Sequence, residues 1–215
     1  MSDVNSGEDN QALLQRMLRK RPPPGEHCDF CAAPLALEHS HLIELAARRI
    51  LCSCRPCYIV FEPEGAAVGR YRPIPERYLE LADFALEDAT WDALAIPIGL
   101  AFLFYNSLEK KMVAFYPSPV GATESLLPLD TWGEIAAANS VLSSLSADVE
   151  AILIQRSPER PRCFIVPIDA AYELVGTIRS TWKGFDGGEE AHRRIGEFFD
   201  RVEERARGSV TAHVT

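Results

Sequence analysis

The feature that most constrains this chain is the clustering of its cysteines. Five of the six cysteines lie within the 30 residues from Cys28 to Cys57, and only Cys163 lies elsewhere. Residues 1–10 are polar and acidic and contain no apolar segment of the kind found in secretory signals, so we expect a cytoplasmic location. In a reducing compartment, clustered thiols act as metal ligands or redox groups rather than as disulfides.

The spacing of four of these cysteines is typical of a metal site. Cys28 and Cys31 form one C-x-x-C motif, and Cys54 and Cys57 form a second after 22 intervening residues. One such motif curls two thiolates onto one edge of a metal ion, and a return of the chain by two strands brings the second pair to complete a tetrahedron. The sequence therefore predicts that these four cysteines hold one metal ion.

The paired motifs resemble a zinc ribbon or a rubredoxin-like module of about 30 residues. Rubredoxin-type turns usually place glycine after the second cysteine, where this chain has Ala32 and Tyr58. Hydrogen bonds from the backbone to sulfur tune the potential of an iron site, whereas structural zinc needs only ligands and closure. The departure favours zinc, with iron as the alternative.

Further ligand types lie beside the four cysteines. Cys52 is a fifth thiol, and in a strand it would lie on the same side as Cys54, while His39 and His41 would share one face. Cys52 could replace Cys54 as a ligand, react, or form a second site with His39 and His41. The competing interpretation is that the histidines form ordinary hydrogen bonds or face water. Cys163 lies in an apolar run and is expected in the core.

Composition and turn signals divide the chain into four parts. The expected parts are a disordered N-terminus with a short helix and a proline linker at 1–25, the metal module at 26–62, an α+β domain at 63–207 and a tail at 208–215. Within the metal module we expect three strands, at 41–45, 49–53 and 58–61.

The larger part alternates apolar hairpins with helices. Strands are expected at 96–105, 112–116, 150–155 and 163–167, and helices at 87–95, at 130–139, after a capping Asp169 and at 189–207. This order predicts an α+β fold in which an antiparallel sheet of two hairpins is covered by helices. Residues 116–125 are expected to form a proline-bounded connection.

Charge and motifs exclude several classes of function. The chain has 22 Lys and Arg against 31 Asp and Glu, a net charge of -9, which argues against a nucleic acid partner. The sequence contains no run of about 18 apolar residues, so we expect no membrane-spanning helix. We find no P-loop, no nucleophile elbow and no acid–base pair, so we nominate no catalytic residue and expect a protein that is not an enzyme.

Longer tracts of the chain also resemble a protein family. They are Cys28 to Cys31, His39-Ser40-His41-Leu42, Cys52 to Cys57, and the stretches 96–102, 114–119, 121–129 and 166–176. In this order, over roughly residues 27–200, they resemble an uncharacterised family of actinobacterial type that is encoded beside genes for high-affinity nickel–iron (NiFe) hydrogenases.

That resemblance implies an accessory role, with a hydrogenase subunit or an assembly factor as the partner. It supplies no activity and no catalytic residue. Three alternatives stay open: an iron-holding, rubredoxin-like carrier of one electron for a hydrogenase, a metal or cluster delivery factor that uses Cys52 with His39 and His41, and an RNA-binding ribbon. The small basic excess and the lack of an aromatic stacking platform count against the last.

Overall fold

The structure is a computed structural model that describes residues 25–63, 65–125, 129–156, 161–184 and 187–212. It contains a three-stranded sheet near the N-terminus and a six-stranded sheet that follows it, and all strand pairs are antiparallel. Helices accompany both sheets, so the predicted α+β class is confirmed. The expected disordered segment, helix and linker of residues 1–24 lie outside the described residues.

The three-stranded sheet has the order β2-β1-β3. Its strands are β1 (Ser40–Glu44), β2 (Arg49–Ser53) and β3 (Tyr71–Pro73), and helix α2 (Arg55–Phe61) and the short helix η1 (Ala66–Gly69) lie between β2 and β3. The hairpin of β1 and β2 confirms two predicted strands. Strand β3 follows residue 62, where the sequence suggested that the metal module ends; the division into domains stays a prediction.

The prediction of a strand at 58–61 was wrong, because these residues form most of α2. Pro56 lies in the first turn of α2, where a residue without an N–H is tolerated. The N–H of Tyr58 donates to the carbonyl of Cys54 at 2.9 Å. This bond starts the helix directly at the second cysteine pair, and it overrides the preference of Ile59 and Val60 for strands.

Three partly buried aromatic rings pack against one another beside the cysteines. Phe30 lies 4.7 Å from Phe61 and 5.4 Å from Tyr71, measured between ring centroids, and Phe61 lies 5.4 Å from Tyr71. The rings come from the first cysteine motif, from α2 and from β3. They therefore join the three segments that surround the cysteines.

The six-stranded sheet has the order β4-β9-β8-β5-β6-β7. Its strands are β4 (Leu79–Glu80), β5 (Leu100–Asn106), β6 (Lys111–Ser118), β7 (Gly121–Ser125), β8 (Glu150–Gln155) and β9 (Arg162–Pro167). Both predicted hairpins, β5–β6 and β8–β9, are confirmed.

The prediction of a connection at 116–125 was wrong. These residues complete β6 and form β7, which pairs with β6 at the edge of the sheet. Gly121 has a φ of 132°, and the hydroxyl of Ser118 donates to the carbonyl of Gly121 at 2.9 Å. The prolines on either side of Ser118 concealed a tight hairpin: Pro117 lies beyond the residues of β6 that pair with β5, where a missing N–H is tolerated.

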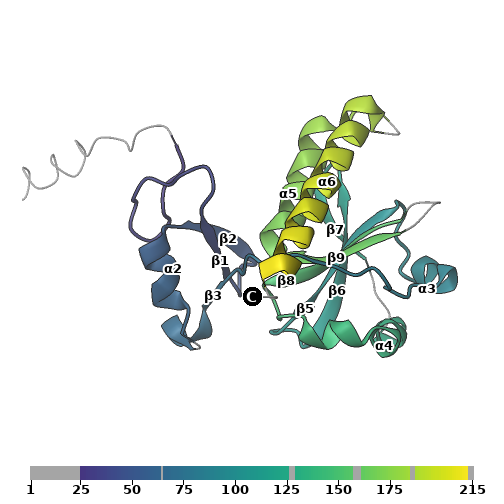
Figure 1. Cartoon of the computed structure of the whole chain (residues 1–215), viewed down its shortest axis with the longest axis horizontal. Helices are drawn as coiled ribbons and strands as arrows, with labels where there is room; N and C mark the ends of the chain where they lie inside the picture. Colours follow the sequence, from purple (N-terminus) through teal and green to yellow (C-terminus); the bar gives the residue numbers. More distant parts are fainter. Residues whose placement is uncertain (1–24, 64, 126–128, 157–160, 185–186, 213–215) are drawn as a thin grey trace, which may run out of the picture.

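Helices cover both faces of the six-stranded sheet (Figure 1). They are α3 (Asp88–Ala93), α4 (Leu129–Ala138), η2 (Ser140–Ser144), α5 (Ile168–Thr181) and α6 (Gly188–Ala212). The pair α5 and α6 lies on one face, and α3 and α4 contribute to the other. Because α6 continues to Ala212, the prediction of a tail was wrong for residues 208–212.

Side chains alternate between the two faces along each central strand. In β5, Phe102 faces the α5–α6 side, while Ala101 and Leu103 face the other side. Cys163 is buried on that other side at 2% exposure, which confirms its expected place in the core.

The two sheets pack against each other. Ile43 of β1 belongs to the apolar cluster that includes Phe104 of β5 and Ile168 of α5. The guanidinium of Arg72 donates to the carboxylate of Asp148 at 2.9 Å. Within the described part of the chain, no helix has both the length and the apolar character needed to cross a membrane.

Candidate metal centre

The structure brings together the four cysteines of the two C-x-x-C motifs. The Sγ atoms of Cys28, Cys31, Cys54 and Cys57 all lie within 4.8 Å of one another, and those of Cys31 and Cys54 are 3.6 Å apart. A tetrahedral zinc site with Zn–S bonds of ~2.3 Å separates its sulfurs by about 3.8 Å. A disulfide would need about 2.05 Å, and all six cysteines are free. The four thiols can therefore hold a metal ion.

The first motif folds into a tight turn without glycine. The N–H of Ala32 donates to the carbonyl of Cys28 at 2.8 Å, and the N–H of Cys28 donates to the carbonyl of Ala33 at 2.8 Å. Ala32 has a φ of 59°, in the left-handed region that glycine prefers. Alanine thus adopts the conformation for which rubredoxin-type turns use glycine.

The second motif lies at the start of a helix. Cys54 is the extended N-cap residue of α2, with φ -73° and ψ 156°, and Cys57 lies in the first turn. The first pair thus comes from a turn and the second pair from a helix start, with the β1–β2 hairpin between them. This differs from the expected pair of similar turns, because Tyr58 continues a helix.

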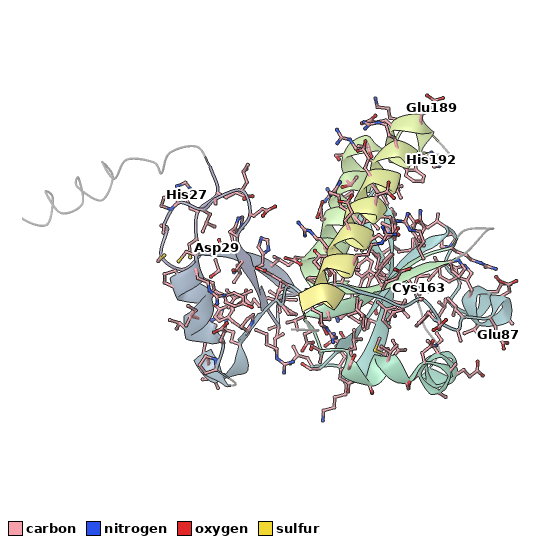
Figure 2. All side chains as sticks on the ribbon, in the orientation of Figure 1. His27, Asp29, Glu87, Cys163, Glu189 and His192 are labelled. Carbon is pink, nitrogen blue, oxygen red and sulfur yellow. The ribbon has the colours of Figure 1, made fainter. Side chains whose placement is uncertain are left out.

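Asp29 connects the two motifs. Its N–H donates to the carbonyl of Cys52 at 2.9 Å, and its carboxylate accepts a hydrogen bond from the N–H of Cys52 at 2.7 Å. Asp29 therefore fixes the first motif to the strand that leads into the second, and Figure 2 shows it in this part of the molecule, far from Cys163. Sequence reasoning missed this residue, because a lone aspartate between two cysteines carries no recognisable signal.

The thiols of Cys28 and Cys57 differ in their acidity. Burial raises the pKa of Cys28, but hydrogen bonds from the backbone of Cys54, Phe30 and Cys31 oppose it and lower this pKa to about 6. Burial and the neighbouring cysteines raise the pKa of Cys57 to about 12. Crowded thiols resist losing several protons because their thiolates repel one another. A bound cation removes this repulsion, so the arrangement suits a metal.

The structure also brings together the second predicted set. A nitrogen of His39, a nitrogen of His41 and the Sγ of Cys52 lie within 4.8 Å of one another. His41 of β1 is the register partner of Cys52 of β2, which places the two side chains on the same face of the sheet. Burial raises the pKa of Cys52, and the charges of Glu26 and Asp29 act in the same direction.

Asp169 contacts this second set through His41, and sequence reasoning misassigned it. The expectation that it caps α5 was wrong: Pro167 is the N-cap, and Asp169 lies in the first turn. Its carboxylate accepts a hydrogen bond from Nδ1–H of His41 at 2.7 Å. The two residues are 128 positions apart, and no local pattern of a single sequence reveals such a contact.

Comparison with known proteins adds a family assignment. One protein-family model, described as a family of unknown function (DUF5947), matches residues 27–206, a range that contains all the cysteines and histidines of both sets. No curated protein and no solved structure matches the chain significantly.

Proposed function

Because the chain belongs to the DUF5947 family of unknown function, its role rests on its own chemistry, and we propose that it is a cytoplasmic, non-enzymatic, metal-binding accessory protein. Zinc at Cys28, Cys31, Cys54 and Cys57 is the proposed metal. The observation that carries the proposal is the convergence of four free thiols within 4.8 Å. Four thiolates fill a tetrahedral zinc site and leave no position for a substrate, as in structural zinc sites.

The proposed role of zinc is to fold the segment around the three-stranded sheet. That segment is small: Leu42 and Leu51 are among its few buried apolar side chains, and the rings of Phe30, Phe61 and Tyr71 are only partly buried. Segments of this size rarely bury enough apolar surface to fold alone, and binding of zinc supplies the missing free energy. The zinc would thus present this part of the surface in one fixed conformation.

Metal analysis tests the proposal directly. Protein purified without air is expected to contain a tightly held, colourless zinc ion that Cys54→Ser releases. Cys163→Ser is the matched control, because Cys163 is buried in the other sheet and should keep the zinc. If Cys54→Ser retains the metal in full, the assignment of ligands is incorrect.

The proposed partner is a hydrogenase subunit or an assembly factor. This part of the proposal rests on the resemblance of the tracts from Cys28 to residue 176 to a family encoded beside NiFe hydrogenase genes. Affinity purification of the tagged chain from its native host, compared with a Cys54→Ser form, tests it. Recovery of a hydrogenase component by the native form alone would support the proposal, and repeated failure to recover one would refute it.

An iron-holding electron carrier is the second candidate, and one observation favours it. Hydrogen bonds from the backbone of Cys54, Phe30 and Cys31 lower the pKa of Cys28, and the same type of bond tunes iron–sulfur potentials. The left-handed Ala32 supplies the turn for which glycine was expected. This candidate requires bound iron with a visible thiolate-to-iron band that a reductant bleaches reversibly; a protein that contains no iron, or that stays colourless after mild oxidation, would exclude it.

A further inference from the structure

Hydrogen bonds leave one ring nitrogen available on each histidine of the second set. Nδ1–H of His39 donates to the carbonyl of Ala36 at 2.9 Å, and that of His41 donates to Asp169 at 2.7 Å. A neutral imidazole that donates through Nδ1 carries its lone pair on Nε2. Both histidines are thus in the tautomer that presents Nε2 as a metal ligand.

His39 supplies the observation that points to a ligand. Its side chain is 7% exposed, and its Nε2 is a buried nitrogen with no hydrogen-bond partner among the residues that the structure describes. Leaving a buried polar atom without a partner is costly. His27 has a similar Nε2, but it belongs to no cluster of three ligand-type side chains in the described ranges. Among the described residues, His39 is the one that combines an unpartnered buried nitrogen with membership of such a cluster.

The donor set matches a transition-metal cation of intermediate softness. Two imidazoles and one thiolate are ligands that zinc and its neighbours in the first transition row prefer. The carboxylate of Asp169 holds His41 as outer carboxylates hold ligating histidines, fixing both the ring and its tautomer. Asp169 is held in turn, because its carboxylate accepts a hydrogen bond from the N–H of Ala170 at 2.8 Å.

The surroundings of the set carry negative charge. A carboxylate oxygen of Glu26 lies 3.6 Å from Nδ1 of His39, and the carboxylate of Asp29 accepts a hydrogen bond from the N–H of Cys52. With Asp169, three carboxylates lie around the two imidazoles and the thiol. Their field attracts a cation to this place.

We propose that His39, His41 and Cys52 form a second metal site, which binds one Zn²⁺-like cation and leaves a coordination position open. Three protein ligands do not complete a tetrahedron, so water or a donor from another molecule takes the fourth position. His39, His41 and Asp169 also line a cleft between the three-stranded sheet and α5–α6. The site is therefore suited to an exchangeable ion; it rests on the fold that the four-cysteine centre is proposed to stabilise, and its own ligands are tested separately below.

Equilibrium dialysis of the full chain against buffered Zn²⁺, followed by metal analysis, tests the site. We expect one zinc ion that resists a chelator and a second that the chelator removes. His39→Gln and Cys52→Ser should each lower the affinity for the second ion by more than about 100-fold. Asp169→Asn, which acts through His41, should lower this affinity by about 10–100-fold. His192→Gln is the control, because His192 is exposed and bonded to its own helix.

The outcomes separate this proposal from the function proposed above. If the native protein binds an exchangeable zinc but no chelator-resistant zinc, the proposed structural centre is refuted and the proposed second site is supported. Absence of an exchangeable zinc, or its persistence in all three variants, would overturn the second site. Circular dichroism of each variant shows whether the fold survives, and Asp169→Asn, on α5, gives a test that leaves the cysteine segment unaltered.

Discussion

The guanidinium of Arg77 forms a two-pronged ion pair with the buried carboxylate of Glu150. Nε donates to Oε1 at 2.6 Å and Nη2 donates to Oε2 at 2.7 Å, and the Glu150 side chain is 1% exposed. Arg77 precedes β4, at one edge of the six-stranded sheet, and Glu150 begins β8 in its interior. The pair thus fixes the segment that joins the two sheets.

Arg77→Met is expected to lower the free energy of unfolding by about 3 kcal/mol, because it leaves a buried carboxylate without its counter-charge. Arg201→Met is the matched control: Arg201 pairs with Glu173 on the surface, so its loss should cost less than about 1 kcal/mol. Urea denaturation of both variants measures the difference. Equal costs would show that Glu150 is stabilised mainly by other groups, such as the N–H of Ser146.

The stability of the protein should fall at alkaline pH because of Tyr172. Burial raises the pKa of Tyr172 above 10.0, the ordinary value. Its contribution is therefore complete below pH 10 and is lost as pH rises further, when the phenol ionises in the unfolded chain before it does so in the folded one. Relative to Tyr172→Phe, the native protein should lose up to about 1.4 kcal/mol per pH unit in that range. A constant difference between the two proteins across this range would contradict the prediction.

Gly187→Ala should destabilise the protein more than Gly184→Ala. Both glycines have positive φ, 90° and 68°, so alanine at either place costs about 1 kcal/mol in backbone strain. At Gly187 a Cβ would also lie 2.9 Å from the ring of Trp182, whereas at Gly184 it would meet nothing within 4 Å. Overpacking adds roughly 1–3 kcal/mol. Thermal unfolding of the two variants gives the comparison, and equal melting temperatures would mean that Trp182 moves away at little cost.

Removal of metal should destabilise the segment around the three-stranded sheet and leave the stability of the six-stranded sheet unchanged. Amide hydrogen exchange in β2 and α2 is expected to speed up by more than about 100-fold in metal-free protein, because the local core is small and the ion supplies folding free energy. Exchange in β8, in the middle of the six-stranded sheet, should stay unchanged. Equal protection of α2 with and without metal would show that the thiols have no structural role.

The sequence predicted the regular parts of the fold well. Apolar runs and turn residues located the hairpins β5–β6 and β8–β9, since both are signals that a short stretch of sequence contains. It failed at α2, where β-branched residues suggested a strand and Pro56 in the first turn was overlooked. It failed again at β7, because proline and serine favour a connection, whereas Pro117 lies within a paired strand.

The candidate sites also combine features that local sequence reveals with features that depend on the tertiary fold. The spacing of Cys28, Cys31, Cys54 and Cys57 sufficed to group them, because all four lie in one short stretch of chain. Asp169 could not be found, because its link to His41 depends on how α5 packs against β1. Local spacing identifies ligands, whereas the groups that orient them come from the tertiary fold.

The position of the two ligand sets along the chain has a consequence for biosynthesis. The four cysteines and the second set all lie between Cys28 and Cys57, whereas β9 and Asp169 follow more than a hundred residues later. At a synthesis rate of about 5–20 residues per second, the cysteines leave the ribosome roughly 5–20 s before β9 does. The four thiols are thus available to a metal ion while the chain is still being made, and Asp169 reaches His41 only as α5 forms.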